Sequence, residues 1–148
     1  MIRTLVAILT LTATQLQAEA PQVVTDIAPV HSLVAQVMDG VGTPDLIVPP
    51  GPAAHHLALR PSDARKLAQA QVVIWAGPAL TPWLSDPLET LAPKAATLTL
   101  LNTPGWAHRD LTGGHEHGAE AAQTNHAVDP HAWLDPEVAM VWVRAIRN

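Results

Sequence analysis

Two adjacent histidines in a proline-rich stretch are the residues of this chain whose type and spacing most directly suggest chemistry. His55 and His56 follow Pro49, Pro50 and Pro52 in the sequence. Each proline fixes its own φ angle and favours extended backbone in the residue before it, so the loop has little freedom to lose when a ligand binds. Such stiffness suits a preformed metal site, and we interpret the stretch as half of one. The alternative is a pair of solvated loop histidines with no partner.

The composition restricts which metal chemistry is open to these histidines. The 148-residue chain contains no cysteine, which excludes both a disulfide framework and a thiolate metal site. A transition metal would therefore bind nitrogen and oxygen ligands alone. The chain has eight histidines against eight lysines plus arginines, an unusual balance, and imidazole binds zinc, copper, iron and nickel. The histidines are thus the signal to follow along the chain.

Further histidines fall in the second half of the chain. The range 102–130 lacks a regular apolar pattern, and a loop of this length is functional or disordered. Its histidine-rich run is a compositional indication of metal affinity. We treat His56 and the histidines of this range as possible auxiliary metal ligands; the alternative is a solvated insert whose histidines are incidental. The histidines of the range are His108, His115, His117 and His126.

Apolar periodicity predicts the elements that must position these residues. Short apolar or β-branched runs predict four strands, at residues 22–25, 45–48, 72–75 and 97–101. Helical spacing predicts helices at 30–38, after an N-cap at Ser62, and over 81–91 with an interruption at Pro87. His31 lies beside the apolar stripe of the first helix, so we interpret it as a packed helix residue rather than a ligand.

The alternation of strands and helices indicates an α/β fold, with a four-stranded, mostly parallel sheet flanked by helices. In such sheets ligands bind beyond the carboxyl ends of the strands. His55 and His131 each lie between a predicted strand and a predicted helix, so we expect them to converge at one edge. Zinc in a thiol-free site takes about four nitrogen or oxygen ligands, and two histidines supply half of them. Other candidates within the chain are His31, His56, the histidines of 102–130 and Asp129.

Charge and the amino-terminal segment narrow the class of protein. A formal net charge of -5, without a basic stripe, argues against a nucleic-acid partner. Residues 1–20 are typical of a secretory signal peptide, with Arg3 ahead of a mostly apolar run and small residues at Ala18 and Ala20. The apolar run is shorter than the roughly 20 residues of a membrane-spanning helix. We therefore predict an exported protein, with a membrane anchor as the alternative.

Four stretches of the sequence together resemble a known family. They are Ile27-Ala-Pro-Val-His-Ser-Leu-Val-Ala-Gln-Val-Met-Asp-Gly-Val-Gly42, the run from Leu46 to Asp63, Val73-Ile-Trp-Ala-Gly-Pro78, and Pro130-His-Ala-Trp-Leu-Asp-Pro-Glu137. They resemble the zinc-uptake substrate-binding proteins of bacterial ABC transporters, the ZnuA/TroA-like family. The resemblance implies that His55 and His131 bind the metal. It also implies that the histidine-containing tract between them marks the zinc-specific branch.

The resemblance further implies a domain organisation. Family members have two α/β lobes joined by a long helix, and this chain resembles the amino-terminal half only. We expect a signal peptide at 1–20, an amino-terminal metal-binding lobe at 21–135, and the start of the inter-lobe helix at 136–148, with the second lobe absent. The family has serine and proline where this chain has Ala53 and Ala54. His56 therefore competes with His55 as the ligand, and we favour His55.

The function that the resemblance implies is non-catalytic. A monomeric protein would capture zinc in the periplasm and deliver it to an ABC-transporter permease. We expect zinc rather than manganese, because manganese favours more oxygen ligands. One alternative is a zinc-dependent hydrolase, although the sequence lacks a His-Glu-x-x-His arrangement. Another is a truncated product that acts at most as a weak metal buffer. We also expect the apolar face of the final helix to form an exposed patch.

Overall fold

The computed structural model, which describes residues 19–51, 54–109 and 128–148, is built around a parallel four-stranded sheet. The strands are β1 (Val23–Thr25), β2 (Asp45–Leu46), β3 (Val72–Trp75) and β4 (Ala96–Thr99). Their order across the sheet is β2-β1-β3-β4, and every neighbouring pair is parallel. The carboxyl ends of the strands therefore share one edge, and the predicted α/β fold is confirmed.

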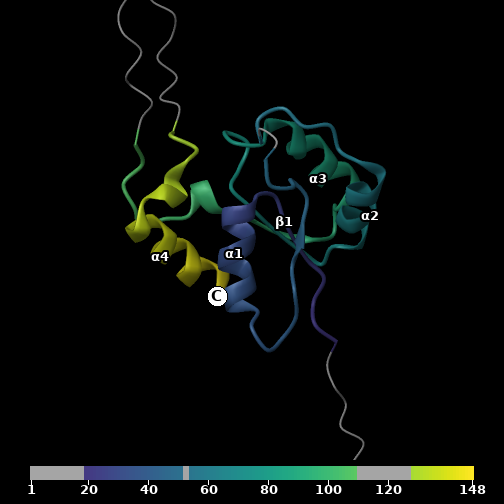
Figure 1. Ribbon diagram of the computed structural model, residues 1–148, viewed down its shortest axis with the longest axis horizontal. Coiled ribbons are helices and arrows are strands. Elements are labelled where there is room, and N and C mark those ends of the chain that lie inside the picture. Colours follow the sequence, from purple (N-terminus) through teal and green to yellow (C-terminus); the bar gives the residue numbers. More distant parts are fainter. Residues whose placement is uncertain (1–18, 52–53, 110–127) are drawn as a thin grey trace, which may run out of the picture.

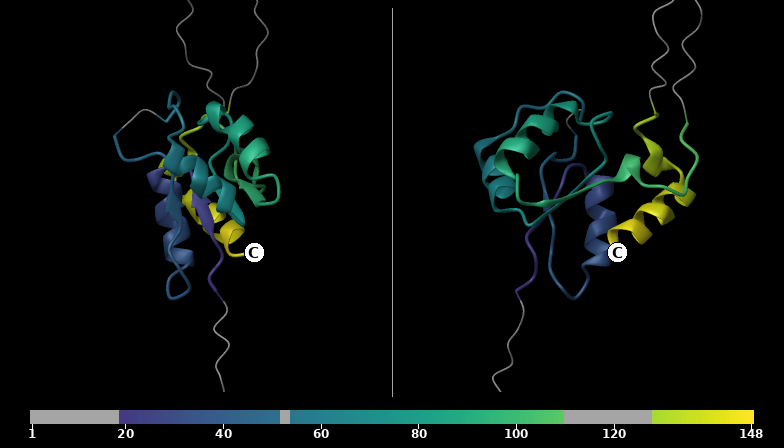
Figure 2. Two further views of the ribbon diagram at one scale, coloured as in Figure 1. Left: turned by 90° about the vertical axis from the view of Figure 1, so that its right-hand side faces the viewer. Right: turned by 180° about the vertical axis from the view of Figure 1, so that it is seen from behind.

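Helices cover both faces of the sheet (Figure 1). In the described part of the chain they are α1 (Ala28–Val37), α2 (Pro61–Gln69), α3 (Ser85–Leu91) and α4 (Pro136–Ile146), with short 3₁₀ helices η1 (Pro82–Leu84), η2 (Leu100–Asn102) and η3 (Ala132–Leu134). α1 contacts α4 on one face, and α2 contacts α3 on the other (Figure 2). The sheet is thus the middle layer of three.

Alternate residues of β3 point to opposite faces of the sheet. Val73 and Trp75 pack with the apolar side chains of α2 and α3, whereas Ile74 packs with those of α1 and α4. A strand covered on both faces needs apolar side chains at consecutive positions. This requirement explains the unbroken apolar run at 72–75, which the sequence-based prediction identified as a strand with the same bounds.

Two features of the helices differ from the sequence-based prediction, and proline explains both. α2 begins at Pro61, with Arg60 in extended backbone as its N-cap, so the predicted N-cap at Ser62 is wrong. Proline suits the first helical position because its missing N–H is not needed there, and it disfavours helical backbone in the residue before it. The interruption predicted at Pro87 falls instead between η1 and α3. Pro87 lies in the first turn of α3, where no backbone hydrogen bond is lost.

Two of the strands end earlier than the apolar pattern predicts. β2 stops at position 46 rather than 48, and β4 stops at 99 rather than 101. The chain after β2 still follows the end of β1, because the amides of Ile47 and Val48 donate to the carbonyl oxygens of Thr25 and Asp26 at 3.0 and 2.8 Å. The backbone is therefore guided along the sheet up to the start of the proline loop.

The last helix begins as predicted but buries the face that was expected to be exposed. Asp135 accepts a hydrogen bond from the amide of Glu137 at 3.0 Å, and Pro136 occupies the first helical position. Val138 and Trp142 are buried where α4 packs against α1. The expected exposed patch on this face is therefore a wrong prediction, since α1 already covers it.

The described residues contain no helix that is both long enough and apolar enough to cross a membrane. Residues 1–18, which form most of the predicted signal peptide, lie outside the described ranges, as do 52–53 and 110–127. The signal peptide therefore stays a prediction.

Candidate metal site

His55 lies at the carboxyl edge of the sheet, in the loop that leaves β2. It lines a pocket of about 320 Å³ whose wall includes apolar side chains that follow β1, β2 and β3, among them Ile27, Val48 and Leu80. Gly51 in this loop has a φ of +107°, a backbone conformation that side-chain-bearing residues rarely adopt. The turn that leads to His55 therefore depends on glycine as well as on proline.

His131 reaches the same pocket from the far end of the described chain. It is the residue that caps the start of η3, and it lines the pocket together with His55. The ring centres of His55 and His131 are 5.8 Å apart, and their planes meet at 70°. Trp133 also contacts the His131 ring, with ring centres 5.3 Å apart. The fold thus brings together the two histidines that the sequence singled out.

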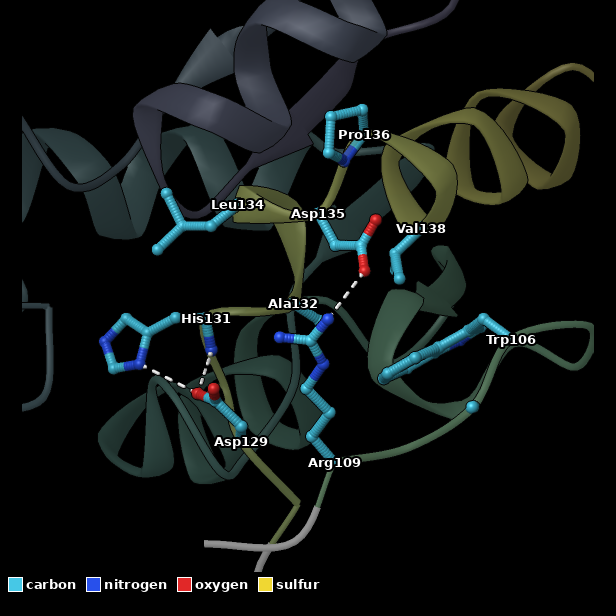
Figure 3. A pocket seen from close by; sticks show the side chains of 10 residues that line it. Trp106, Arg109, Asp129, His131, Ala132, Leu134, Asp135, Pro136 and Val138 are labelled. Atoms are coloured by element: carbon cyan, nitrogen blue, oxygen red, sulfur yellow. Dashed lines mark hydrogen bonds and ion pairs between the residues drawn. The ribbon is translucent and has the colours of Figure 1, made fainter.

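Asp129 holds the ring of His131 in place (Figure 3). Its Oδ1 accepts a hydrogen bond from the backbone amide of His131 at 2.9 Å and lies 3.1 Å from Nδ1 of the ring. The backbone amide of His131, and then its ring, hold the pKa of the Asp129 carboxyl below its usual value of 3.8, although burial acts in the opposite direction. The ionised carboxylate favours a proton on Nδ1, which leaves the Nε2 lone pair available to a metal.

A second pocket, of about 370 Å³, shares His131 and extends to the start of α4 (Figure 3). Arg109 and Asp135 form an ion pair in its lining, with Nη2 and Oδ2 3.1 Å apart. The backbone amide of Asp129 donates to the carbonyl oxygen of Arg109 at 2.7 Å. The residues that flank the histidine-containing range 110–127 are therefore joined beside His131.

The auxiliary histidines stand apart from this pair where the structure describes them. His56 is exposed, and His108 is exposed and stacks on Trp106 with ring centres 4.1 Å apart. His31 lies with Nε2 3.1 Å from the carbonyl oxygen of Pro44, which agrees with its interpretation as a packed helix residue. The remaining candidates lie outside the described residues, and their role stays a prediction: His115, His117 and His126.

The described residues bring together two imidazoles rather than a closed set of metal ligands. Across the described ranges, no three His, Cys, Asp or Glu side chains are grouped so as to hold one ion. Two imidazoles on one tetrahedral zinc ion have ring centres roughly 5 Å apart. The observed 5.8 Å between His55 and His131 needs only a small adjustment to reach that separation. The pair therefore fits zinc as half of its ligand set.

Asp26 is a residue of this edge that the sequence analysis did not single out. Its buried carboxylate accepts hydrogen bonds from the amides of Ile27 and Ala76, at 2.8 and 2.9 Å, and lies 3.4 Å from the Thr81 hydroxyl. Burial raises the pKa of Asp26 to about 6, against the lowering effect of these hydrogen bonds. An aspartate directly after a buried strand, at the ligand-binding edge, was the available signal.

Comparison with known sequences finds relatives that share one described role. Residues 23–148 match the sequence profile of a family described as zinc-uptake complex component A, periplasmic. The chain is 38% identical over 154 residues to the high-affinity zinc uptake system protein ZnuA of Paracoccus denitrificans, a match that covers 88% of this chain and 47% of that protein. It is 38% identical over 108 residues to ZnuA of Brucella abortus, covering 70% and 32% respectively. The chain thus spans less than half the length of these relatives.

Comparison with solved structures finds the same fold. The crystal structure of Zn(II)-bound AdcA from Streptococcus pneumoniae superposes with a TM-score of 0.66 at 25% sequence identity. The match covers 86% of this chain and 25% of that chain. The arrangement of sheet and helices described above is therefore present in a protein whose structure holds zinc.

Proposed function

This chain belongs to the family of the periplasmic zinc-uptake complex component A, and from that premise we propose that it captures zinc for delivery to an ABC-transporter permease. The observation that carries the proposal is the approach of His55 and His131, with ring centres 5.8 Å apart, in one pocket at the sheet edge. Imidazole nitrogen is the zinc ligand that a chain without cysteine can best supply.

His55 and His131 are the two proposed ligands, and each has its own support. Proline and glycine restrict the loop that presents His55. Asp129 bonds to Nδ1 of His131, and a carboxylate in this position fixes the orientation of a ligand imidazole. His56 is exposed and takes no part in the primary pair.

We assign the histidines of the range 102–130 an auxiliary role, in which they collect zinc weakly and raise its concentration near the pair. The hydrogen bond between Asp129 and Arg109 supports this role, because these two residues flank the range 110–127 and line one pocket with His131. Weak binding to several histidines close to a stronger site raises the effective concentration of the ion there.

In this proposal, residues 21–135 form one metal-binding lobe and residues 136–148 begin a helix that leads to a second lobe. Zinc takes about four ligands, and the described pocket offers two imidazoles. A second lobe would supply the remaining ligands. The Paracoccus protein is long enough to contain such a lobe, since the match covers 47% of it.

The proposed role includes export through residues 1–20, action in the periplasm as a monomer, and no catalytic step. The family description itself names the periplasm. A zinc hydrolase needs a carboxylate that can act as a base on metal-bound water. In the described ranges the carboxylate bonded to this pair is Asp129, and its Oδ1 is already engaged by two groups of His131. The geometry therefore favours capture over hydrolysis.

Zinc titration by calorimetry tests the proposal on the parent chain and three variants. His55→Ala and His131→Ala should each lower the zinc affinity by more than about tenfold, because the loss of an outer-shell partner alone commonly costs that much. His56→Ala is the matched control and should bind as the parent does. If His55→Ala and His131→Ala also bind as tightly as the parent, the assignment is wrong and the range 102–130 is the binding segment.

A further inference from the structure

We propose that Trp83 is a positioning residue, which holds the His55 loop in its zinc-binding conformation; this inference rests on the proposed function. The indole Nε1 of Trp83 donates a hydrogen bond to the carbonyl oxygen of Ala54 at 2.6 Å. That carbonyl belongs to the peptide unit that contains the nitrogen of His55. The bond therefore fixes the backbone at the point where the proposed ligand is attached.

Trp83 can act as an anchor because its own position is restrained on both sides. It lies in η1 between Thr81 and Leu84, which are both buried. The hydroxyl of Thr81 lies 3.4 Å from the carboxylate of Asp26, and the indole of Trp83 packs against the apolar clusters on both faces of the sheet. A donor that is already immobile loses little conformational entropy when it bonds. The loop carbonyl thus meets a preorganised partner.

Apart from this bond, the contacts of the loop close to His55 are apolar, since Ala54 and Leu57 pack against the core. Among the described residues of the range 49–59, the bond from Trp83 to Ala54 is the one hydrogen bond that joins the loop to the rest of the molecule. Prolines limit the φ angles of this loop, but they do not fix its position relative to the sheet. His131 is held separately by Asp129. The distance between the two imidazoles therefore depends on what anchors the loop, and the described structure places Trp83 in that role.

A purely structural role and a positioning role for Trp83 predict different effects of its replacement on zinc affinity. A tryptophan that only fills the core would, when replaced, lower the free energy of unfolding and leave the zinc affinity of the folded protein unchanged. A tryptophan that positions the loop changes the zinc affinity, and it does so only while His55 is present. A double-mutant cycle separates the two roles.

The variant Trp83→Phe keeps an aromatic ring and removes the N–H donor. We expect its zinc affinity, measured by calorimetry with zinc chloride, to fall about 3- to 10-fold, the effect of one net hydrogen bond. Trp75→Phe is the matched control, since the Trp75 indole also donates one hydrogen bond, to Oγ1 of Thr99 at 2.9 Å, but not to this loop. Trp75→Phe should bind zinc as the parent does.

The same substitution is then made in the His55→Ala background, where Trp83→Phe should cause no further loss of zinc affinity. The inference is overturned if Trp83→Phe binds zinc as tightly as the parent while His55→Ala binds weakly, or if its loss persists without His55. If His55→Ala binds as tightly as the parent, the proposed function and this inference both fall. Should Trp83→Phe not fold, benzothienylalanine at position 83 preserves the ring size, removes only the N–H donor and is judged by the same outcomes.

Discussion

The buried carboxylate of Asp26 should make the stability of this chain fall as the pH rises from about 4 to about 6. Burial raises the pKa of Asp26 from an ordinary value of 3.8 to about 6. Between these two values the folded chain keeps a proton that the unfolded chain has released. The free energy of unfolding therefore decreases with rising pH across this window, and the full loss is reached above the folded pKa. Below the unfolded pKa the loss disappears.

The size of the effect follows from the separation of the two pKa values. A difference of one pKa unit corresponds to about 1.4 kcal/mol, so a rise from 3.8 to about 6 corresponds to about 3 kcal/mol. Asp26→Asn removes the titration. In this variant the side-chain amide nitrogen faces the backbone N–H of Ile27 or Ala76, which donates a hydrogen bond to the carboxylate in the parent. The loss of that acceptor costs about 1–3 kcal/mol at every pH. The variant can thus be less stable than the parent, and the informative quantity is the change of the difference with pH.

Urea unfolding followed by tryptophan fluorescence, with EDTA present and at pH values from 4 to 7.5, measures this change. The difference in unfolding free energy between Asp26→Asn and the parent should shift by about 2.5 kcal/mol in favour of the variant between pH 4 and pH 7.5, because part of the full effect is already present at pH 4. Thr81→Val removes a hydrogen bond that lowers the pKa of Asp26. In this variant the loss of stability with rising pH should therefore continue to a higher pH than in the parent. A difference that stays constant within about 0.5 kcal/mol across this range would refute the reasoning.

Two further substitutions test other parts of the structure. Asp129→Ala should lower the zinc affinity about 10- to 100-fold, because the carboxylate that orients a proposed ligand imidazole is lost. Calorimetry beside the exposed Asp39→Ala variant measures this, and equal affinities would contradict the role. Gly77→Ala should lower the free energy of unfolding by about 1–3 kcal/mol, since Gly77 has a φ of +136° and an added Cβ would lie 3.0 Å from Cγ2 of Thr99. Gly40→Ala, with a φ of +75° and no atom within 4 Å of an added Cβ, should cost less in urea unfolding; equal costs would show that the Thr99 contact contributes nothing.

Much of the fold was predictable because the positions of its strands and helices follow from local sequence patterns. The unbroken apolar run of β3 and the helical spacing within α1 and α4 each reflect which faces an element buries. The errors arose where two local signals competed. Ser62 is a good N-cap residue, but Pro61 before it is a better first helical residue, and the geometry of proline prevailed. At β2 and β4 the apolar runs continue past the strand ends, because a buried residue does not have to lie in a strand.

The candidate site was predictable in part, for a related reason. Order along the chain places His55 and His131 after strands, and parallel strands end at a common edge, so their convergence followed from topology. The role of Asp129 was less accessible, since its sequence position fits a metal ligand as well as it fits the partner of His131 that the structure shows. Nothing in the local sequence marks Trp83 as a partner of the loop.

The sequence by itself determined the fold class and the absence of thiol ligands, because these depend on composition or on a short-range period. It predicted His55 and His131 as ligands through the expected sheet topology and the resemblance to a family. The tertiary structure alone decided the separation of the two rings, the burial of Asp26 and the anchoring of the His55 loop. The bond from Ala76 to Asp26 joins residues 50 positions apart, and the bond from Trp83 to Ala54 joins residues 29 positions apart. Such contacts depend on how whole elements pack, and side-chain periodicity within one element carries no information about which group of another element it will meet.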